Sequence, residues 1–161
     1  MTAVDQALRA LHRSERRLGA HLRAAADRHR VEHEVHHVAL DVAGWSDEHV
    51  RRIAHVAAGR GLRLSPSPAR RPAAVRALAR GASTALGRRR ATGALLLADL
   101  RALHLRATGV ADDWQVLGQA ASTLRDAGLR ELVGSCRPRV ERIAHWAETQ
   151  LAEQAPQVVA S

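Results

Sequence analysis

The stretch VDQALRALHRSERRLGAHLRAA, residues 4–25, repeats its apolar side chains at alternating steps of four and three residues. This spacing places them on one side of an α-helix, as in helices that pack into bundles. The apolar seam consists of Val4, Leu8, Leu11, Leu18, Leu22 and Ala25. Glu15 stands on the same seam, between Leu11 and Leu18, where burial of an unpaired carboxylate is costly. We therefore predict a long helix over residues 4–29 that directs one carboxylate into the interior.

A second helix is predicted after a polar turn near residues 28–34. Its apolar seam runs over residues 35–56, and Gly59 and Gly61 are typical signals for the end of a helix. Because the turn between the two long helices is short, we expect them to lie side by side and antiparallel.

Two more helices are predicted in the second half of the chain, separated by the tripeptide DAG at 126–128. The third is expected to begin near residue 94, with a seam that extends to Leu124, and the fourth to run from residue 129 to just before Pro156. These boundaries follow from the apolar periodicity and from the turn-forming residues that interrupt it.

Pro138 lies inside the fourth predicted helix. A proline in a helix removes one backbone hydrogen bond and crowds the carbonyl four residues earlier, which here belongs to Gly134. Since glycine is the least obstructive residue at that position, we predict a kink and no break.

The two helical pairs are separated by a crossover, residues 61–93, whose first part is rich in Pro, Gly and Ser. One short helix could form within it, after Pro72. The length of 161 residues favours a single domain over the whole chain. We therefore predict an all-α four-helix bundle with a long crossover between its second and third helices, which is the topology of ferritin-like folds.

Two stretches extend this likeness beyond topology. HEVHHVALDVAGWSDEHVRRIA, 33–54, and PRVERIAHWAETQLAEQAP, 138–156, resemble helices of a ferritin-like branch of small bacterial proteins. The resemblance implies a di-metal centre inside the bundle, held by one Glu on each of two helices and a Glu-x-x-His pair on each of the others. Carboxylate oxygens together with imidazole suit iron or manganese.

Glu15 fits the position of the first-helix Glu ligand in the ferritin-like pattern. On the second helix, seam spacing leads from Trp45 to His49, which we expect at the same depth as Glu15. Ser46 stands three residues before His49, where the pattern requires a Glu. We therefore predict a buried polar pair of Glu15 and His49 in a reduced or lost metal site. A metal held by these two residues is the alternative.

The other histidines give weaker signals. His33 and His37 lie one helical turn apart and could share a surface metal, although two ligands alone make a weak site. His36 and His55 are expected to face solvent. His29 shares no spacing with the others. The single cysteine, Cys136, lies on the fourth seam and is interpreted as a small buried hydrophobe.

The formal charge of +9 is carried entirely by arginine, since the sequence contains no lysine. Such a charge suits a polyanionic partner such as nucleic acid or a membrane surface, but a coding bias toward Arg and Ala is the favoured explanation. Arg70, Arg71 and the run 88–90 lie in the crossover without an interleaved aromatic residue for base stacking. Nucleic acid is therefore ranked behind a protein partner or a second copy of the chain.

Several classes of protein are disfavoured by what the sequence lacks. It contains no Gly-rich phosphate loop and no recognisable catalytic motif. One cysteine cannot form an internal disulfide, which agrees with the cytoplasm. No apolar run approaches the ~18 residues of a membrane span, so a membrane is not expected as a partner.

We therefore expect a ferritin-like helical protein with a reduced or lost di-metal site, acting as an interaction or assembly module and not as an enzyme. No cofactor is expected. The first alternative is an iron- or manganese-binding ferritin-like oxidoreductase or metal store. The second is a basic DNA-associated protein of the same fold.

Overall fold

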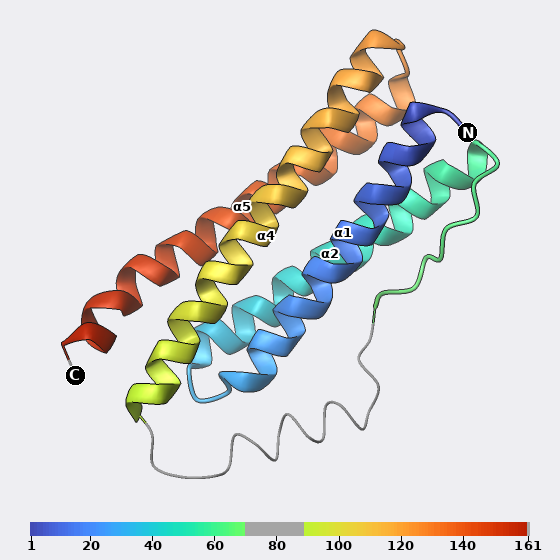
Figure 1. Cartoon of the computed structure of the whole chain (residues 1–161). Helices are drawn as coiled ribbons and strands as arrows, with labels where there is room; N and C mark the ends of the chain where they lie inside the picture. The colour runs from blue at the N-terminus through green and yellow to red at the C-terminus, as the bar shows by residue number, and fades with distance from the viewer. Residues whose placement is uncertain (70–88, 161) are drawn as a thin grey trace.

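The computed structural model describes residues 1–69 and 89–160, and side chains within 1–69 and 92–160. The described residues form helices and no strands, so the all-α prediction is confirmed (Figure 1). The helices are α1 (Ala3–Arg28), α2 (His33–Gly59), α4 (Arg89–Thr123) and α5 (Ala127–Val159). None of these described helices is both long enough and apolar enough to cross a membrane.

The helices pack as two antiparallel pairs, α1 with α2 and α4 with α5 (Figure 1). The pairs meet through contacts of α1 with α4 and of α2 with α5. Arg60, just after α2, pairs with Asp5 at the start of α1, while Asp99 near the start of α4 pairs with Arg28 at the end of α1. The chain between α2 and α4 therefore joins opposite ends of the bundle, and α2 and α4 run in the same direction.

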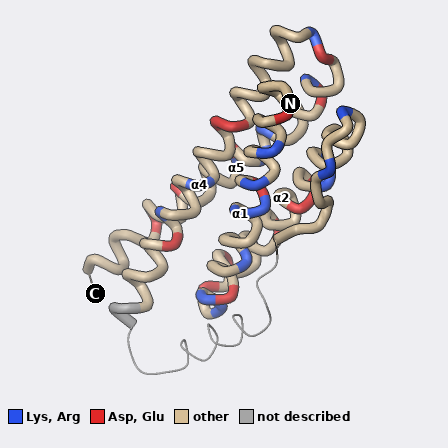
Figure 2. The backbone as a smooth tube through the Cα atoms, turned by 45° about the vertical axis from the view of Figure 1, so that its right-hand side comes forward, with Lys and Arg blue, Asp and Glu red and all other residues tan. Residues whose placement is uncertain are grey.

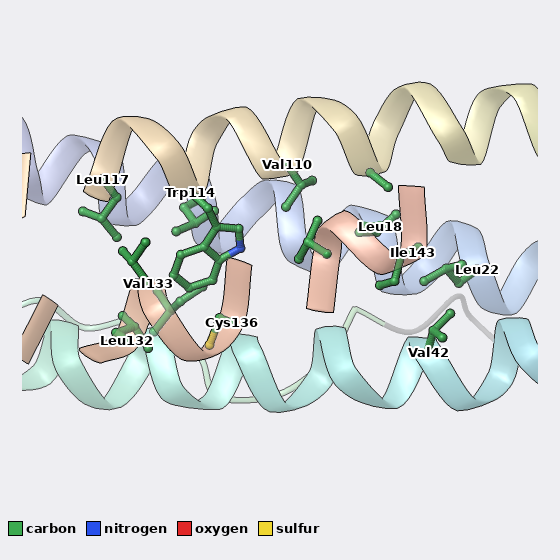
Figure 3. Close-up of a cluster of buried hydrophobic side chains, with 14 of the residues drawn as sticks. Leu18, Leu22, Val42, Val110, Trp114, Leu117, Leu132, Val133, Cys136 and Ile143 are labelled. Carbon is green, nitrogen blue, oxygen red and sulfur yellow. The ribbon is translucent and has the colours of Figure 1, made fainter. Parts of the chain in front are cut away.

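The core is formed by the predicted seams. All six apolar seam residues of α1 are buried, as are the seam residues in the middle of α4 and α5. In α2, Val35, Val42 and Ile53 of the predicted seam are buried, whereas Val38, Trp45 and Val56 are half-buried. Figure 3 shows the central cluster, in which Trp114 from α4 and Cys136 from α5 point into the space between the helices. Burial of a Leu or Ile side chain contributes roughly 1.5–3 kcal/mol, so these seams supply most of the stabilisation that holds the helices together.

Two predicted helix boundaries are wrong. α4 begins at Arg89, five residues before the predicted start, and α5 continues through Pro156 to Val159. A side-chain carbon added to Gly93 would lie 3.0 Å from a methyl carbon of Val158, so the two extensions pack against each other. The contact between these helix ends explains why both helices outlast their local stop signals. The part of the predicted crossover at 70–88 lies outside the described residues.

The fourth predicted helix does not break at Pro138, as expected. Pro138 and Gly134 are both exposed, so water can reach the carbonyl that the proline leaves without a donor. The expected break at 126–128 is shorter than predicted. Asp126 caps α5 by accepting a hydrogen bond from the Leu129 amide at 3.0 Å, and the helix begins at the next residue.

Two seam assignments also need correction. Leu124 is 57% exposed, because α4 ends at Thr123 and the chain turns before Leu124 can face the core. Gly19, which falls on the outer side in the sequence pattern, is buried against α2. A side-chain carbon at Gly19 would lie 3.3 Å from Cβ of Ser46, so glycine allows α1 and α2 to approach closely at this point.

Candidate functional site

Glu15 and His49 meet at the centre of the bundle. Nδ1 of His49 lies 2.9 Å from Oε1 of Glu15, and both side chains are 0% exposed. Because a carboxylate oxygen accepts hydrogen bonds, His49 donates through Nδ1. The contact predicted from the two seams is therefore present, and it joins α1 to α2 at the depth expected from their shared turn.

Trp114 of α4 is a third member of this site, and the sequence did not reveal its role. Its indole Nε1 donates to the same Oε1 of Glu15 at 2.7 Å. The Trp114 ring also stands edge-on to the His49 ring, with centroids 5.9 Å apart and planes at 81°. One carboxylate oxygen thus ties together three helices, through one donor from α2 and one from α4.

Three other polar atoms at the centre lack a hydrogen-bond partner among the described residues. Oε2 of Glu15, Nε2 of His49 and Oγ of Ser46 are all buried without a hydrogen bond to any described residue. Ser46 lies one turn before His49, opposite Gly19, where the backbones of α1 and α2 come close. This close approach leaves little room for the longer Glu side chain that the ferritin-like pattern places at residue 46.

The residues at the centre fit a di-metal centre poorly. Of the six expected ligands, the described residues supply Glu15 and His49. No group of three or more His, Cys, Asp and Glu side chains in 1–69 and 92–160 is arranged to hold a metal ion. The indole of Trp114 can only donate, so it directs a proton at the oxygen that a bridging metal would use. The donor set instead suits a hydrogen-bonded core.

The surface histidine pair lies at the start of α2. The rings of His33 and His37 stack at 6.4 Å with an interplanar angle of 12°, and both side chains are exposed. The ring of His36 meets His37 edge-on at 5.0 Å. No described acid or cysteine completes a metal-binding group with them. Metal binding by His33 and His37 stays a prediction.

Cys136 is fully buried in α5, as expected for a small hydrophobic side chain. Burial raises the pKa of its thiol to about 11, more than the nearby Arg52 lowers it. The thiol is therefore protonated at neutral pH and a poor nucleophile.

A second buried carboxylate–histidine contact lies at the end of the bundle where α1 ends and α4 begins. Oδ2 of Asp99 lies 2.7 Å from Nε2 of His29, which is 1% exposed. Arg28 donates to both Asp99 oxygens, through Nε and Nη2, each at 2.8 Å. Burial raises the pKa of Asp99, but the hydrogen bonds from His29 and Arg28 together lower it below its ordinary value.

No pattern in the sequence indicated this second contact. Asp99 stands beside the third seam, and His29 lies just past the end of α1, so neither residue occupies a seam position. The contact between Asp99 and His29 could be predicted by pairing the charges at the end of α1 with those at the start of α4. Such a pairing requires the direction of α4 relative to α1 to be known in advance.

Other histidines serve as links to the backbone. His36, expected to face solvent, is half-buried, and its Nδ1 lies 2.8 Å from the Ala26 carbonyl oxygen across the α1–α2 turn. His12 is buried, with Nε2 2.7 Å from the carbonyl oxygen of Ser65 at the start of the crossover. The prediction that His36 faces solvent is therefore wrong, because the short turn brings its side chain against the end of α1.

Comparison with known proteins gives no match: no family model, no curated protein and no solved structure corresponds to this chain.

Proposed function

We propose that this chain is a ferritin-like bundle whose metal centre has been replaced by a hydrogen-bonded core, and that it acts as an assembly module. The observation that carries the proposal is the buried Oε1 of Glu15, which accepts from His49 and Trp114 on two other helices. The antiparallel pairs and the connection between opposite bundle ends support the ferritin-like topology. The proposed centre holds helices in register and performs no chemistry.

The polar core serves specificity in this proposal. An apolar seam alone permits neighbouring helices to slide by a turn, whereas a buried carboxylate with two donors is satisfied in one alignment only. Glu15 is therefore expected to fix the depth of α1 against α2 and α4. A bundle held in one register offers a defined outer surface, which an assembly module requires.

The outer face of α4 supports self-association. Leu105 and Val116 are 51% and 62% exposed, and we call them the α4 outer pair. They are eleven residues apart, which is about three helical turns, so they lie on the same face. Gly109 lies between them and would accommodate a close approach, since a side-chain carbon there meets nothing within 4 Å. A second copy of the chain is the proposed occupant of this face.

Light scattering on the purified chain tests this role. We expect a mass above that of the 17.4 kDa monomer, and a return to the monomer mass in the variant Leu105→Gln/Val116→Gln. Leu40→Gln/Leu124→Gln is the matched control, since it removes two exposed leucines elsewhere and should leave the mass unchanged. A wild-type protein that stays monomeric at high concentration overturns the assembly role.

One observation favours the alternative of a metal-binding protein. Oε2 of Glu15 and Nε2 of His49 are buried without a partner, and both atoms are metal ligands in other proteins. Metal analysis of tag-free protein after exposure to Fe²⁺ or Mn²⁺ separates the two candidates. We expect no bound metal. A stoichiometric metal that is lost in Glu15→Leu/His49→Leu supports the metal-binding protein instead.

A further inference from the structure

One side of α1 carries a dense set of arginines. Arg9, Arg13, Arg16 and Arg17 fall within about 100° around the helix axis. Figure 2 shows basic residues recurring along α1. The chain passes beside α1 where the Ser65 carbonyl oxygen contacts His12, and we add the exposed Arg63, two residues earlier, to this set. We call these five residues the α1 arginine face.

These arginines combine close spacing on one side of a helix with the lack of a counter-ion, which several scattered arginines elsewhere in the described residues also lack. Within the described residues none of the five forms an ion pair, whereas Arg23, Arg28, Arg60 and Arg139 each pair with an acid of another helix or of the next turn. The crossover cannot supply a negative charge to neutralise these arginines, because residues 49–98 contain no Asp or Glu. Among the residues that the structure describes, the positive charge on this face is therefore not neutralised by ion pairs.

The neighbouring groups agree with a positive local potential. Burial lowers the pKa of His12, and repulsion by Arg16 and Arg13 lowers it further, although the contact with the Ser65 carbonyl oxygen favours the charged form. On the α4 side, Asp113 lines a shallow hollow together with Arg17 and Arg106, which is two guanidinium groups to one carboxylate. No ion pair forms there among the described residues.

We propose that the α1 arginine face binds the phosphate backbone of duplex nucleic acid. The planar guanidinium group matches phosphate oxygens in a two-point contact. Residues 9–17 rise about 12 Å along the helix, so their guanidinium groups can reach more than one phosphate of a duplex that lies against α1. The face therefore presents several donors at a spacing that a duplex backbone can meet.

The chemistry of the face selects the backbone over the bases and over a membrane. α1 contains no Trp, and the chain contains no Phe or Tyr, so no aromatic ring is present on the face to stack on bases. Contacts to phosphates carry no sequence information, so the proposed recognition is independent of sequence. A membrane-bound helix would also need large apolar side chains on its exposed face, and the exposed residues within α1 include none.

This role goes beyond the proposed function, because its contacts are made neither by the buried centre nor by the α4 outer pair, although Leu105 of that pair borders the same hollow as Arg17. From the sequence, the arginines of the crossover are the only ones considered as a nucleic-acid contact, and they make nucleic acid a low-ranked partner. The α1 arginine face is a separate set, brought together by the helix and by the return of the crossover onto His12.

Fluorescence anisotropy with a labelled DNA duplex tests the proposal on the full chain, between about 50 and 200 mM salt. The variant is Arg13→Gln/Arg16→Gln/Arg17→Gln, and the matched control is Arg101→Gln/Arg125→Gln/Arg130→Gln, which removes equal charge from exposed sites on α4, the following turn and α5. Circular dichroism verifies that both remain helical. Two unrelated duplex sequences are compared to test sequence independence.

We expect the wild type to bind both duplexes, with affinity falling steeply as salt rises. The α1 variant should bind at least about tenfold more weakly, and its slope of log K against log salt should be shallower by about 2.7, since each lost phosphate contact removes ~0.9. The control should keep the wild-type slope. Absence of binding at low salt, equal weakening by both variants, or binding to phosphatidylserine vesicles without binding to the duplex would each overturn the proposal.

Discussion

Among the described residues, two carboxylates lie within hydrogen-bond distance of a histidine, Glu15 and Asp99, but their surroundings differ. Glu15 at the centre is fully buried, and within the described part of the chain it accepts from the side chains of His49 and Trp114 alone. Asp99 at the bundle end has a side chain that is 16% exposed, and it receives a bidentate arginine as well as His29. The comparison shows how burial sets the importance of a polar contact. Water can replace a lost partner at Asp99 but not at Glu15.

The largest expected effect is the loss of a donor at the centre. His49→Leu leaves a buried carboxylate with Trp114 as its remaining partner, so we expect the free energy of unfolding to fall by about 3–5 kcal/mol. Urea denaturation followed by circular dichroism measures this. His55→Leu, on an exposed position of α2, should change the same free energy by less than about 0.5 kcal/mol. Equal effects would show that the centre has no special role.

Trp114→Phe sharpens the comparison, because it removes the indole donor and keeps most of the aromatic volume. We expect the free energy of unfolding to fall by about 2–3 kcal/mol, since the hydrogen bond to a charged group is lost and packing changes little. In a Glu15→Leu background the same substitution should be clearly less harmful, as there is no carboxylate to leave unpaired. An identical loss in both backgrounds would mean that Trp114 contributes through packing alone.

At the bundle end, Asp99→Asn should lower the free energy of unfolding by about 1–2 kcal/mol, because Arg28 is partly exposed to water and the amide oxygen of Asn can still accept a hydrogen bond from the buried His29. Asp27→Asn is the matched control, as it removes the exposed pair with Arg30 and should have an effect below about 0.5 kcal/mol. An effect of Asp99→Asn as large as that of His49→Leu would contradict the difference between the two sites.

A smaller effect concerns acid. The pKa of His12 is lowered from its ordinary value of 6.5, so the folded state favours the neutral ring. Its contribution to stability is full above pH 6.5 and is lost as pH falls from that value through the folded pKa. Between about pH 7 and 5 the wild type should therefore lose more stability than His12→Gln. The urea midpoint measures this, with His55→Gln as an exposed control. Parallel slopes would contradict it.

The sequence predicted the Glu15–His49 contact because both residues interrupt an otherwise apolar seam at a depth set by one short turn. Helical periodicity gives the direction of each side chain, and the turn gives the register of the two helices. The role of Trp114 was not predicted, because its depth relative to Glu15 depends on how α4 packs against α1. A long crossover precedes α4, so the sequence does not determine this packing directly. Register across such a connection is a tertiary property.

The predicted helix ends failed for a related reason. Gly93 and Pro156 are local signals against helix, yet α4 and α5 extend across them where Gly93 meets Val158. Packing between distant segments outweighs a local penalty of roughly 1 kcal/mol for a glycine in a helix. Gly19 likewise reads as an outer residue from α1 alone, and its contact with Ser46 appears only when α2 is in place.

A double-mutant cycle of Glu15→Leu, His49→Leu and the double variant tests most directly whether the two residues form one structural unit. We expect each single variant to lower the free energy of unfolding. The loss in the double variant should be smaller than the sum of the two single losses by about 1–3 kcal/mol. The reason is that the double variant leaves no buried polar group without its partner and can pack two leucines at the centre. Losses that add without coupling would contradict a Glu15–His49 unit at the heart of the bundle.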